Sequence, residues 1–138
     1  MTKLSTFLLL LLLLNTVAVH AQSQPSAVEI FKLRDMCQAH ADEFKKQFEN
    51  GYDFYKTDSN YSLRTNHCYV LLEQTAFDNW GIILKLYDGN TKNILATTIE
   101  QTKGEKTGKI YDRDWQEKNS VTYDIASKYI QNKMATER

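Results

Sequence analysis

Residues 67–72, His-Cys-Tyr-Val-Leu-Leu, decide the fold, because this β-forming segment also carries one of the chain's two cysteines. Side chains alternate between the two faces of a strand. Cys68, Val70 and Leu72 therefore share one face, and the odd-numbered residues share the other. We predict a strand over residues 67–75.

A helix is predicted ahead of this strand, over residues 26–49. Ser26 and Glu29 have the spacing of a capping box, and Asn50-Gly51 is a helix stop signal. Phe31 lies about 120° away from the main apolar stripe. That stripe has steps of three and four residues and comprises Ile30, Leu33, Cys37, Ala41, Phe44 and Phe48.

Two more strands are predicted downstream, over Trp80–Tyr87 and Ile94–Glu100. Asp88-Gly89-Asn90 lies between them and is a hairpin signal. A short fourth strand is expected around Ile110-Tyr111. Tyr52–Thr65 is interpreted as irregular, because aromatic residues are mixed there with Asp, Ser and Asn.

A second helix is predicted to close the chain, with Val121, Ile125 and Ile130 on its apolar face. Its start is expected either early, at Asp114, or later, at Asn119 or Ser120.

These elements predict an α+β fold in residues 22–138, a single domain. Its N-terminal helix packs on a three- to four-stranded antiparallel sheet, and a C-terminal helix follows. Both helices are expected on one face of the sheet. Cys37 is central on the helix stripe, so its thiol and that of Cys68 would point into the same helix–sheet interface.

The first 21 residues are interpreted as a cleavable signal peptide. Lys3 precedes an apolar run over residues 7–14, and Val19-His20-Ala21 has the small or apolar residues that signal peptidase reads. The run is too short for a spanning helix, which needs about 20 apolar residues. We therefore expect a secreted or periplasmic protein with no membrane span after cleavage.

Export favours a disulfide between Cys37 and Cys68, because exported compartments are oxidising. Closing a loop of about 30 residues contributes roughly 3.5 to 4 kcal/mol in the chain-entropy model. Free thiols and a metal site with His40 and His67 are the alternatives. The metal site is disfavoured because neighbouring strand residues such as His67 and Cys68 point to opposite faces.

Composition excludes several functions and assigns none. Seventeen basic residues balance seventeen acidic ones, which argues against a nucleic-acid binder with a basic surface. The motifs of serine hydrolases, zinc proteases and phosphate-binding loops are absent from the sequence. We therefore predict no cofactor, no metal and no catalytic residue, although a hydrolase that combines His67 with a carboxylate is an alternative.

Fifteen aromatic residues follow the predicted signal peptide. Exposed Tyr69, Trp80, Tyr87 and Trp115 would suit the binding of a peptide, glycan or protein. The alternative is that these residues complete a small core. Asn60-Tyr61-Ser62 also matches a glycosylation sequon, which matters only in a glycosylating host.

The segment Tyr61–Leu71, together with Cys37 and Leu86-Tyr87-Asp88, resembles a group of small exported bacterial proteins of uncharacterised function. These proteins share the pattern Y-x-x-K/R-x-N-x-C-aromatic-aliphatic. The matching residues here are Tyr61, Arg64, Asn66, Cys68, Tyr69 and Val70. The resemblance implies export and a cysteine pair that joins helix to strand, and it implies no activity.

Together these patterns predict a non-enzymatic exported binding module with a protein or peptide partner. A small hydrolase and a structural or stress-related envelope protein are the alternatives.

Overall fold

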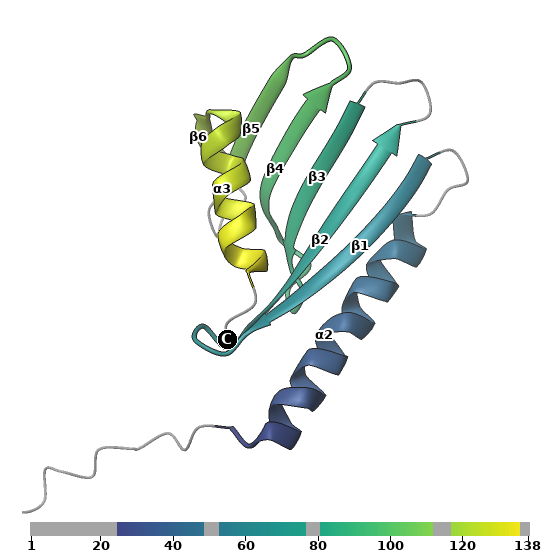
Figure 1. The fold of residues 1–138 in the computed structure, drawn as a ribbon, viewed down its shortest axis with the longest axis vertical. Helices are drawn as coiled ribbons and strands as arrows, with labels where there is room; N and C mark the ends of the chain where they lie inside the picture. Colours follow the sequence, from purple (N-terminus) through teal and green to yellow (C-terminus); the bar gives the residue numbers. More distant parts are fainter. Residues whose placement is uncertain (1–24, 49–52, 77–80, 112–116, 136–138) are drawn as a thin grey trace, which may run out of the picture.

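The computed structural model describes residues 25–48, 53–76, 81–111 and 117–135. It has an α+β fold in which one antiparallel sheet lies between helix α2 (Ala27–Phe48) and helix α3 (Tyr123–Met134) (Figure 1). The six strands are neighbours in the order of the sequence. They are β1 (Asp53–Ser62), β2 (His67–Ala76), β3 (Gly81–Asp88), β4 (Ile94–Gln101), β5 (Lys106–Tyr111) and β6 (Glu117–Val121).

Helix α2 confirms the prediction of a first helix. The Glu29 carboxylate accepts hydrogen bonds from the backbone N–H and the hydroxyl of Ser26, each at 2.7 Å. The backbone N–H of Glu29 donates to Ser26 Oγ at 3.3 Å. The capping box therefore closes the first turn. Neither α2 nor α3, the helices of the described residues, is long and apolar enough to cross a membrane.

Strand β1 occupies most of the segment interpreted as irregular, so that interpretation was wrong. Tyr55 and Tyr61 of this strand pack against the α2 core, and β1 lies at the edge of the sheet. Edge strands tolerate the polar and charged residues that interrupted the pattern, such as exposed Lys56 and Asp58.

The predicted number of three or four strands was too low. The short fourth strand expected around Ile110-Tyr111 is β5, which begins at Lys106. Residues 117–121 form a further strand, β6, where a helix start at Asn119 or Ser120 had been one interpretation. Helix α3 instead begins at Tyr123, and Thr122 occupies the N-cap without a side-chain hydrogen bond. The early helix start predicted at Asp114 lies outside the described residues.

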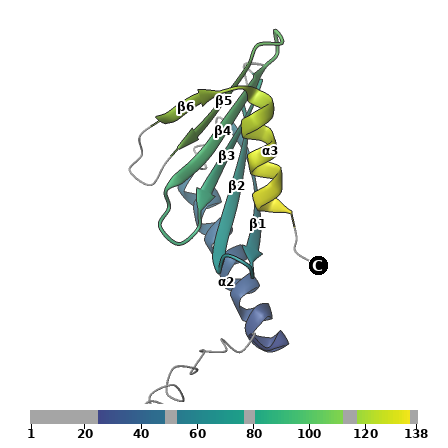
Figure 2. The same cartoon turned by 90° about the vertical axis from the view of Figure 1, so that its left-hand side faces the viewer.

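The two helices lie on opposite faces of the sheet, which corrects the expectation of a single covered face (Figure 2). Strand β2 shows the reason. Its residues Cys68, Val70 and Leu72 are buried with α2, whereas Tyr69 and Leu71 pack in the core that contains Ile130 of α3. An alternating strand that is apolar on both sides needs a cover on each.

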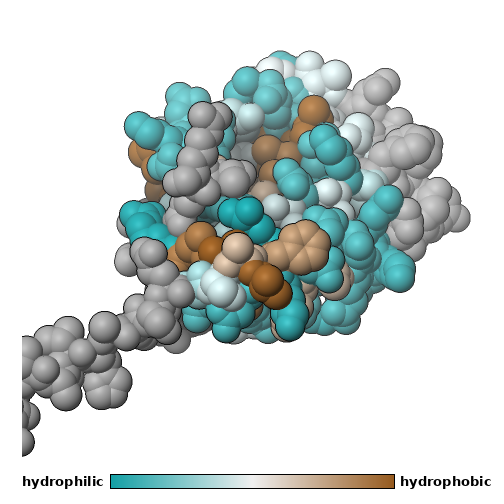
Figure 3. Space-filling model, turned by 60° about the horizontal axis from the view of Figure 1, so that its bottom comes forward, coloured by the Kyte–Doolittle hydropathy of each residue, from teal (hydrophilic) through white to brown (hydrophobic). Residues whose placement is uncertain are grey.

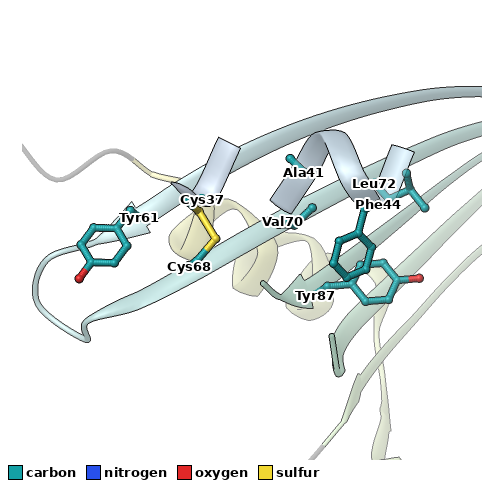
Figure 4. Close-up of a cluster of buried hydrophobic side chains, with 8 residues drawn as sticks. All are labelled: Cys37, Ala41, Phe44, Tyr61, Cys68, Val70, Leu72 and Tyr87. Atoms are coloured by element: carbon teal, nitrogen blue, oxygen red, sulfur yellow. A yellow bond between two sulfur atoms is a disulfide. The ribbon is translucent and has the colours of Figure 1, made fainter. Parts of the chain in front are cut away.

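Disulfide Cys37–Cys68 joins α2 to β2 in the centre of the first core (Figure 4). Both cysteines are buried, so the predicted bridge is confirmed and a metal site or free thiols at these positions are excluded. Beside it, Phe44 of α2 packs on Tyr87 of β3 with ring centroids 4.8 Å apart. Sulfur and aromatic groups together hold α2 on the sheet.

Helix α3 lies close to strand β5. A Cβ added to Gly108 would be 2.8 Å from the Ala126 Cβ and 2.8 Å from the carbonyl oxygen of Thr122. Only a glycine allows this approach. The first residue of the helix, Tyr123, donates its hydroxyl to Glu100 of β4 at 3.0 Å.

The turn between β3 and β4 confirms the hairpin signal at Asp88-Gly89-Asn90. The Asp88 side chain accepts the backbone N–H groups of Asn90 and Thr91 at 2.9 and 3.0 Å. Gly89 lies against the disulfide and donates its N–H to the carbonyl of Cys68 at 2.8 Å. Lys92 completes the turn with φ 62° and pairs with Glu43 of α2 at 3.0 Å.

Substituting Gly89→Ala should destabilise the fold. The new Cβ would lie 2.4 Å from the Cys68 Sγ, which is bonded in the disulfide and has little freedom to move. Overpacking of this kind typically costs about 1–3 kcal/mol. Urea unfolding measures the loss, with Asn90→Ala at the exposed neighbouring position as the control. Equal stability of the two variants would contradict the proposed contact.

Candidate functional site

A groove of about 700 Å³ opens on the α3 face of the sheet. Its apolar and aromatic lining comes from β4, β5 and α3 and consists of Leu95, Ile110, Tyr111 and Tyr129. Its polar lining includes His67, Tyr69, Asp88 and Lys133. Concave sites of this size and mixed lining are typical of small-molecule binding.

A β-bulge shapes one wall of the groove. Leu86 pairs with Ala96 and Tyr87 pairs with Ile94, so Leu95 has no partner on β3. Bulges redirect side chains and are frequent near functional sites. Here the extra residue places Leu95 beside the second core, on the face that α3 covers.

A hydrogen bond joins His67 and Asp88 at one end of the groove. The imidazole Nε2 lies 2.6 Å from Asp88 Oδ2. The strand register brings the two residues together, because Tyr69, two positions after His67, pairs with Asp88 across β2 and β3. The His67 side chain is 42% exposed, whereas that of Asp88 is only 10% exposed. The carboxylate is thus fixed beneath a more accessible imidazole.

Several hydrogen bonds fix the charge state of Asp88. Burial of the carboxyl raises its pKa. The hydrogen bonds from the N–H groups of Thr91 and Asn90 and from the His67 ring lower the pKa by more than burial raises it. The net result is a pKa below the ordinary value of 3.8. The group is therefore ionised at neutral pH and accepts hydrogen bonds from both the turn and the imidazole.

Lys133 and Tyr69 form a second polar cluster beside this pair. Lys133 Nζ donates to the Tyr69 hydroxyl at 3.1 Å and lies 5.0 Å from the centroid of that ring. It also lies 5.6 Å from the centroid of the Tyr129 ring. The Tyr69 ring in turn stacks on His67, with ring centroids 5.7 Å apart. Aromatic faces therefore hold the ammonium of α3 above the groove.

The sequon residue Asn60 has a structural role in the fold. Its side-chain amide donates to the carbonyl oxygens of Lys133 and Ala135 at 2.8 and 3.2 Å. The residue is buried. Asn60 therefore binds the C-terminal end of α3, and a glycan on this nitrogen is incompatible with the folded arrangement.

Of the four predicted binding-surface residues, the structure describes Tyr69 and Tyr87, and these two are buried. Tyr69 is 4% exposed and Tyr87 is 8% exposed, so their expected exposure is corrected. Burial raises the pKa of the Tyr87 hydroxyl, in keeping with its place in the α2 core. Tyr69 still lines the groove. Trp80 and Trp115 lie outside the described residues.

Local sequence signals for the remaining groove residues were weak. Asp88 was interpreted only as a turn residue, but it both holds the turn and lines the groove. Lys133 and Tyr129 lie in the last helix, 64 and 60 positions after Tyr69, and no local pattern connects them to it. Within the part of the chain that the structure describes, no cluster of His, Cys, Asp or Glu could hold a metal ion.

An exposed apolar patch lies on the N-terminal half of α2, which extends beyond the sheet (Figure 1). Phe31 is 71% exposed, and Val28 and Met36 are also exposed. Figure 3 shows apolar side chains at this end of the molecule, beside the grey N-terminal residues. The position of Phe31 away from the helix stripe had indicated such exposure.

Comparisons of the chain with family models, curated proteins and solved structures find no match. The resemblance of Tyr61–Leu71 to small exported bacterial proteins therefore stays a prediction. The structure shows what several of its residues do here. The Tyr61 hydroxyl donates to Asn66 Oδ1 across the β1–β2 turn, Asn66 has φ 51°, and Cys68 forms the disulfide.

Because the pKa of Asp88 is lowered, we expect the contribution of this carboxylate to stability to depend on pH. A carboxyl with a lowered folded-state pKa stabilises the fold above its unfolded value, and this stabilisation disappears as the pH falls through the folded value. The stability advantage of the wild type over Asp88→Asn should therefore shrink below about pH 4. Urea unfolding at a series of pH values measures this change.

Asp58→Asn is the matched control, because Asp58 is an exposed carboxylate on β1. Its difference from the wild type should change less with pH. A constant difference between the wild type and Asp88→Asn at all pH values would contradict the assigned hydrogen bonds.

Proposed function

We propose that this chain is an exported, disulfide-linked binding protein whose groove between α3 and the sheet holds a small molecule with an apolar or aromatic body. The groove itself carries this proposal. Its volume of about 700 Å³ lies within the range of ligand sites, and Leu95, Ile110 and Tyr129 offer apolar contact while a few polar groups offer orientation.

The burial of Tyr69 and Tyr87 favours a small ligand over the protein or peptide partner predicted from the sequence. An exposed tyrosine patch would have supported a flat protein interface. A concave site lined by the same type of residue supports enclosure of a small molecule instead. Export is supported by the predicted signal peptide over residues 1–21 and by the bridge between Cys37 and Cys68.

The uncharged dye N-phenyl-1-naphthylamine is a suitable probe of the groove, because its fluorescence rises in apolar surroundings. The wild type should bind it with saturation. Leu95→Arg should weaken binding about tenfold or more, since a charged side chain would occupy the apolar wall. A fluorescence titration measures both dissociation constants.

Ile82→Arg is the matched control, because Ile82 is an exposed apolar residue of β3 that does not line the groove. It should bind the dye like the wild type. Equal loss in both variants, or a wild type that fails to bind, would contradict the groove as the site. A failure to bind would favour a structural role in the envelope.

A hydrolase remains the second candidate, and the His67–Asp88 pair favours it. A carboxylate at one imidazole nitrogen orients the ring and stabilises its protonated form. His67 would take a proton from water while the water oxygen adds to an ester carbonyl. The protonated ring would then return that proton to the departing alcohol.

Hydrolysis of p-nitrophenyl acetate tests this candidate. If the pair is catalytic, His67→Gln should lower the rate about 10²- to 10⁴-fold. His40→Gln is the control for simple attack by an imidazole outside the groove, because His40 lies half-buried on α2 and does not line the groove. Equal rates for the two variants and the wild type would exclude catalysis by His67.

A further inference from the structure

A second hollow of about 290 Å³ adjoins the groove at the C-terminal end of α3. It shares Tyr69 and Lys133 with the groove. Its polar lining comes from the β1–β2 hairpin and from α3, and it includes Asn60, Ser62, Arg64, Thr65, Asn132 and Lys133. We infer that this hollow is an anion subsite, which receives a phosphate, sulfate or carboxylate group on the ligand of the groove.

The charges of the lining point to an anion. Two basic residues, Arg64 and Lys133, line the hollow, and its described lining contains no carboxylate side chain. Among the lining residues that the structure describes, basic side chains therefore outnumber acidic ones. The Thr65 hydroxyl and the Asn132 amide in this lining are neutral donors, which suit the several oxygens of such a group.

Lys133 is positioned to act as the central cation. Its ammonium has three N–H donors, and one of them is directed to the Tyr69 hydroxyl at 3.1 Å. The rings of Tyr69 and Tyr129 fix its position. Lys133 forms no ion pair with a carboxylate of the described residues. The positive charge of Lys133 is therefore fixed in position, and no carboxylate of the described residues neutralises it.

The end of a helix normally disfavours an anion, because its carbonyl oxygens carry partial negative charge. Here the side-chain amide of Asn60 donates to two of these oxygens, those of Lys133 and Ala135. The amide hydrogens thus offset part of that negative charge. The positive Lys133 lies on the same last turn and offsets more of it.

The ligand class follows from the shared residues. Because Tyr69 and Lys133 line both hollows, one molecule can place an apolar body in the groove and an anionic group beside Arg64. This inference rests on the proposed function. It specifies an amphipathic anion, such as an organic acid or phosphate ester with an aromatic or aliphatic body.

Two dyes with the same aromatic body separate the subsite from the groove. 8-Anilino-1-naphthalenesulfonate carries a sulfonate that N-phenyl-1-naphthylamine lacks. The wild type should bind the sulfonate about tenfold more tightly, which corresponds to about 1.4 kcal/mol. Arg64→Gln should remove this advantage and leave binding of the uncharged dye unchanged, because Arg64 does not line the groove.

Lys128→Gln is the control for general attraction of the anionic dye, since Lys128 is exposed on α3 and lines neither hollow. It should keep the tenfold preference. Equal binding of both dyes by the wild type would overturn the subsite and leave the groove intact. An equal loss of the preference for the sulfonate dye in Lys128→Gln and Arg64→Gln would also overturn the subsite.

Inorganic anions test the subsite without the groove. Phosphate, sulfate and acetate are titrated separately, and the amide resonances of Thr65 and Asn132 are followed by NMR. At least one anion should give saturable shifts with a millimolar dissociation constant, and Arg64→Gln should weaken them. The anion that binds most tightly identifies the anionic group that the subsite prefers. If neither dye binds but the shifts appear, the proposed groove function fails and the subsite stands. If no anion gives saturable shifts, the subsite is overturned.

Discussion

The covalent link between Cys37 and Cys68 is the constraint on which the rest of the structure depends. It fixes α2 on β2, a strand that contributes to both cores. Since side chains on a strand alternate, fixing one face of β2 also fixes where the other face points. The odd-numbered residues His67 and Tyr69 are thereby directed to the α3 side, where they line the groove.

The groove combines two kinds of chemistry at one boundary of the sheet. The side of the groove near β4 and β5 is apolar and owes its shape to the bulge at Leu95. The other side carries fixed charge, because Asp88 is held by its turn and Lys133 is held by two aromatic rings. Under the proposed function, this arrangement would orient a ligand that is itself apolar at one end and polar at the other.

Local patterns predicted what depends on neighbouring residues. Ser26 and Glu29 gave the start of α2, and the alternation around Val70 gave β2. The pairing of His67 with Asp88 depends on the register between two strands, which the sequence does not show. The contact between Tyr69 and Lys133 depends on which face α3 covers. Strand β1 was missed because an edge strand bears polar residues without a regular apolar pattern.

The close packing of Gly89 on the sulfur of Cys68 connects the redox state of the two cysteines to the turn beside the groove. The turn that begins with Asp88 rests directly on the bridge, and its backbone is hydrogen-bonded to Cys68. In a reducing environment the two sulfurs would separate, and the turn would lose its rigid support. If the groove binds a ligand as we propose, a newly made chain would therefore become fully competent to bind only in an oxidising compartment, where the two thiols are joined.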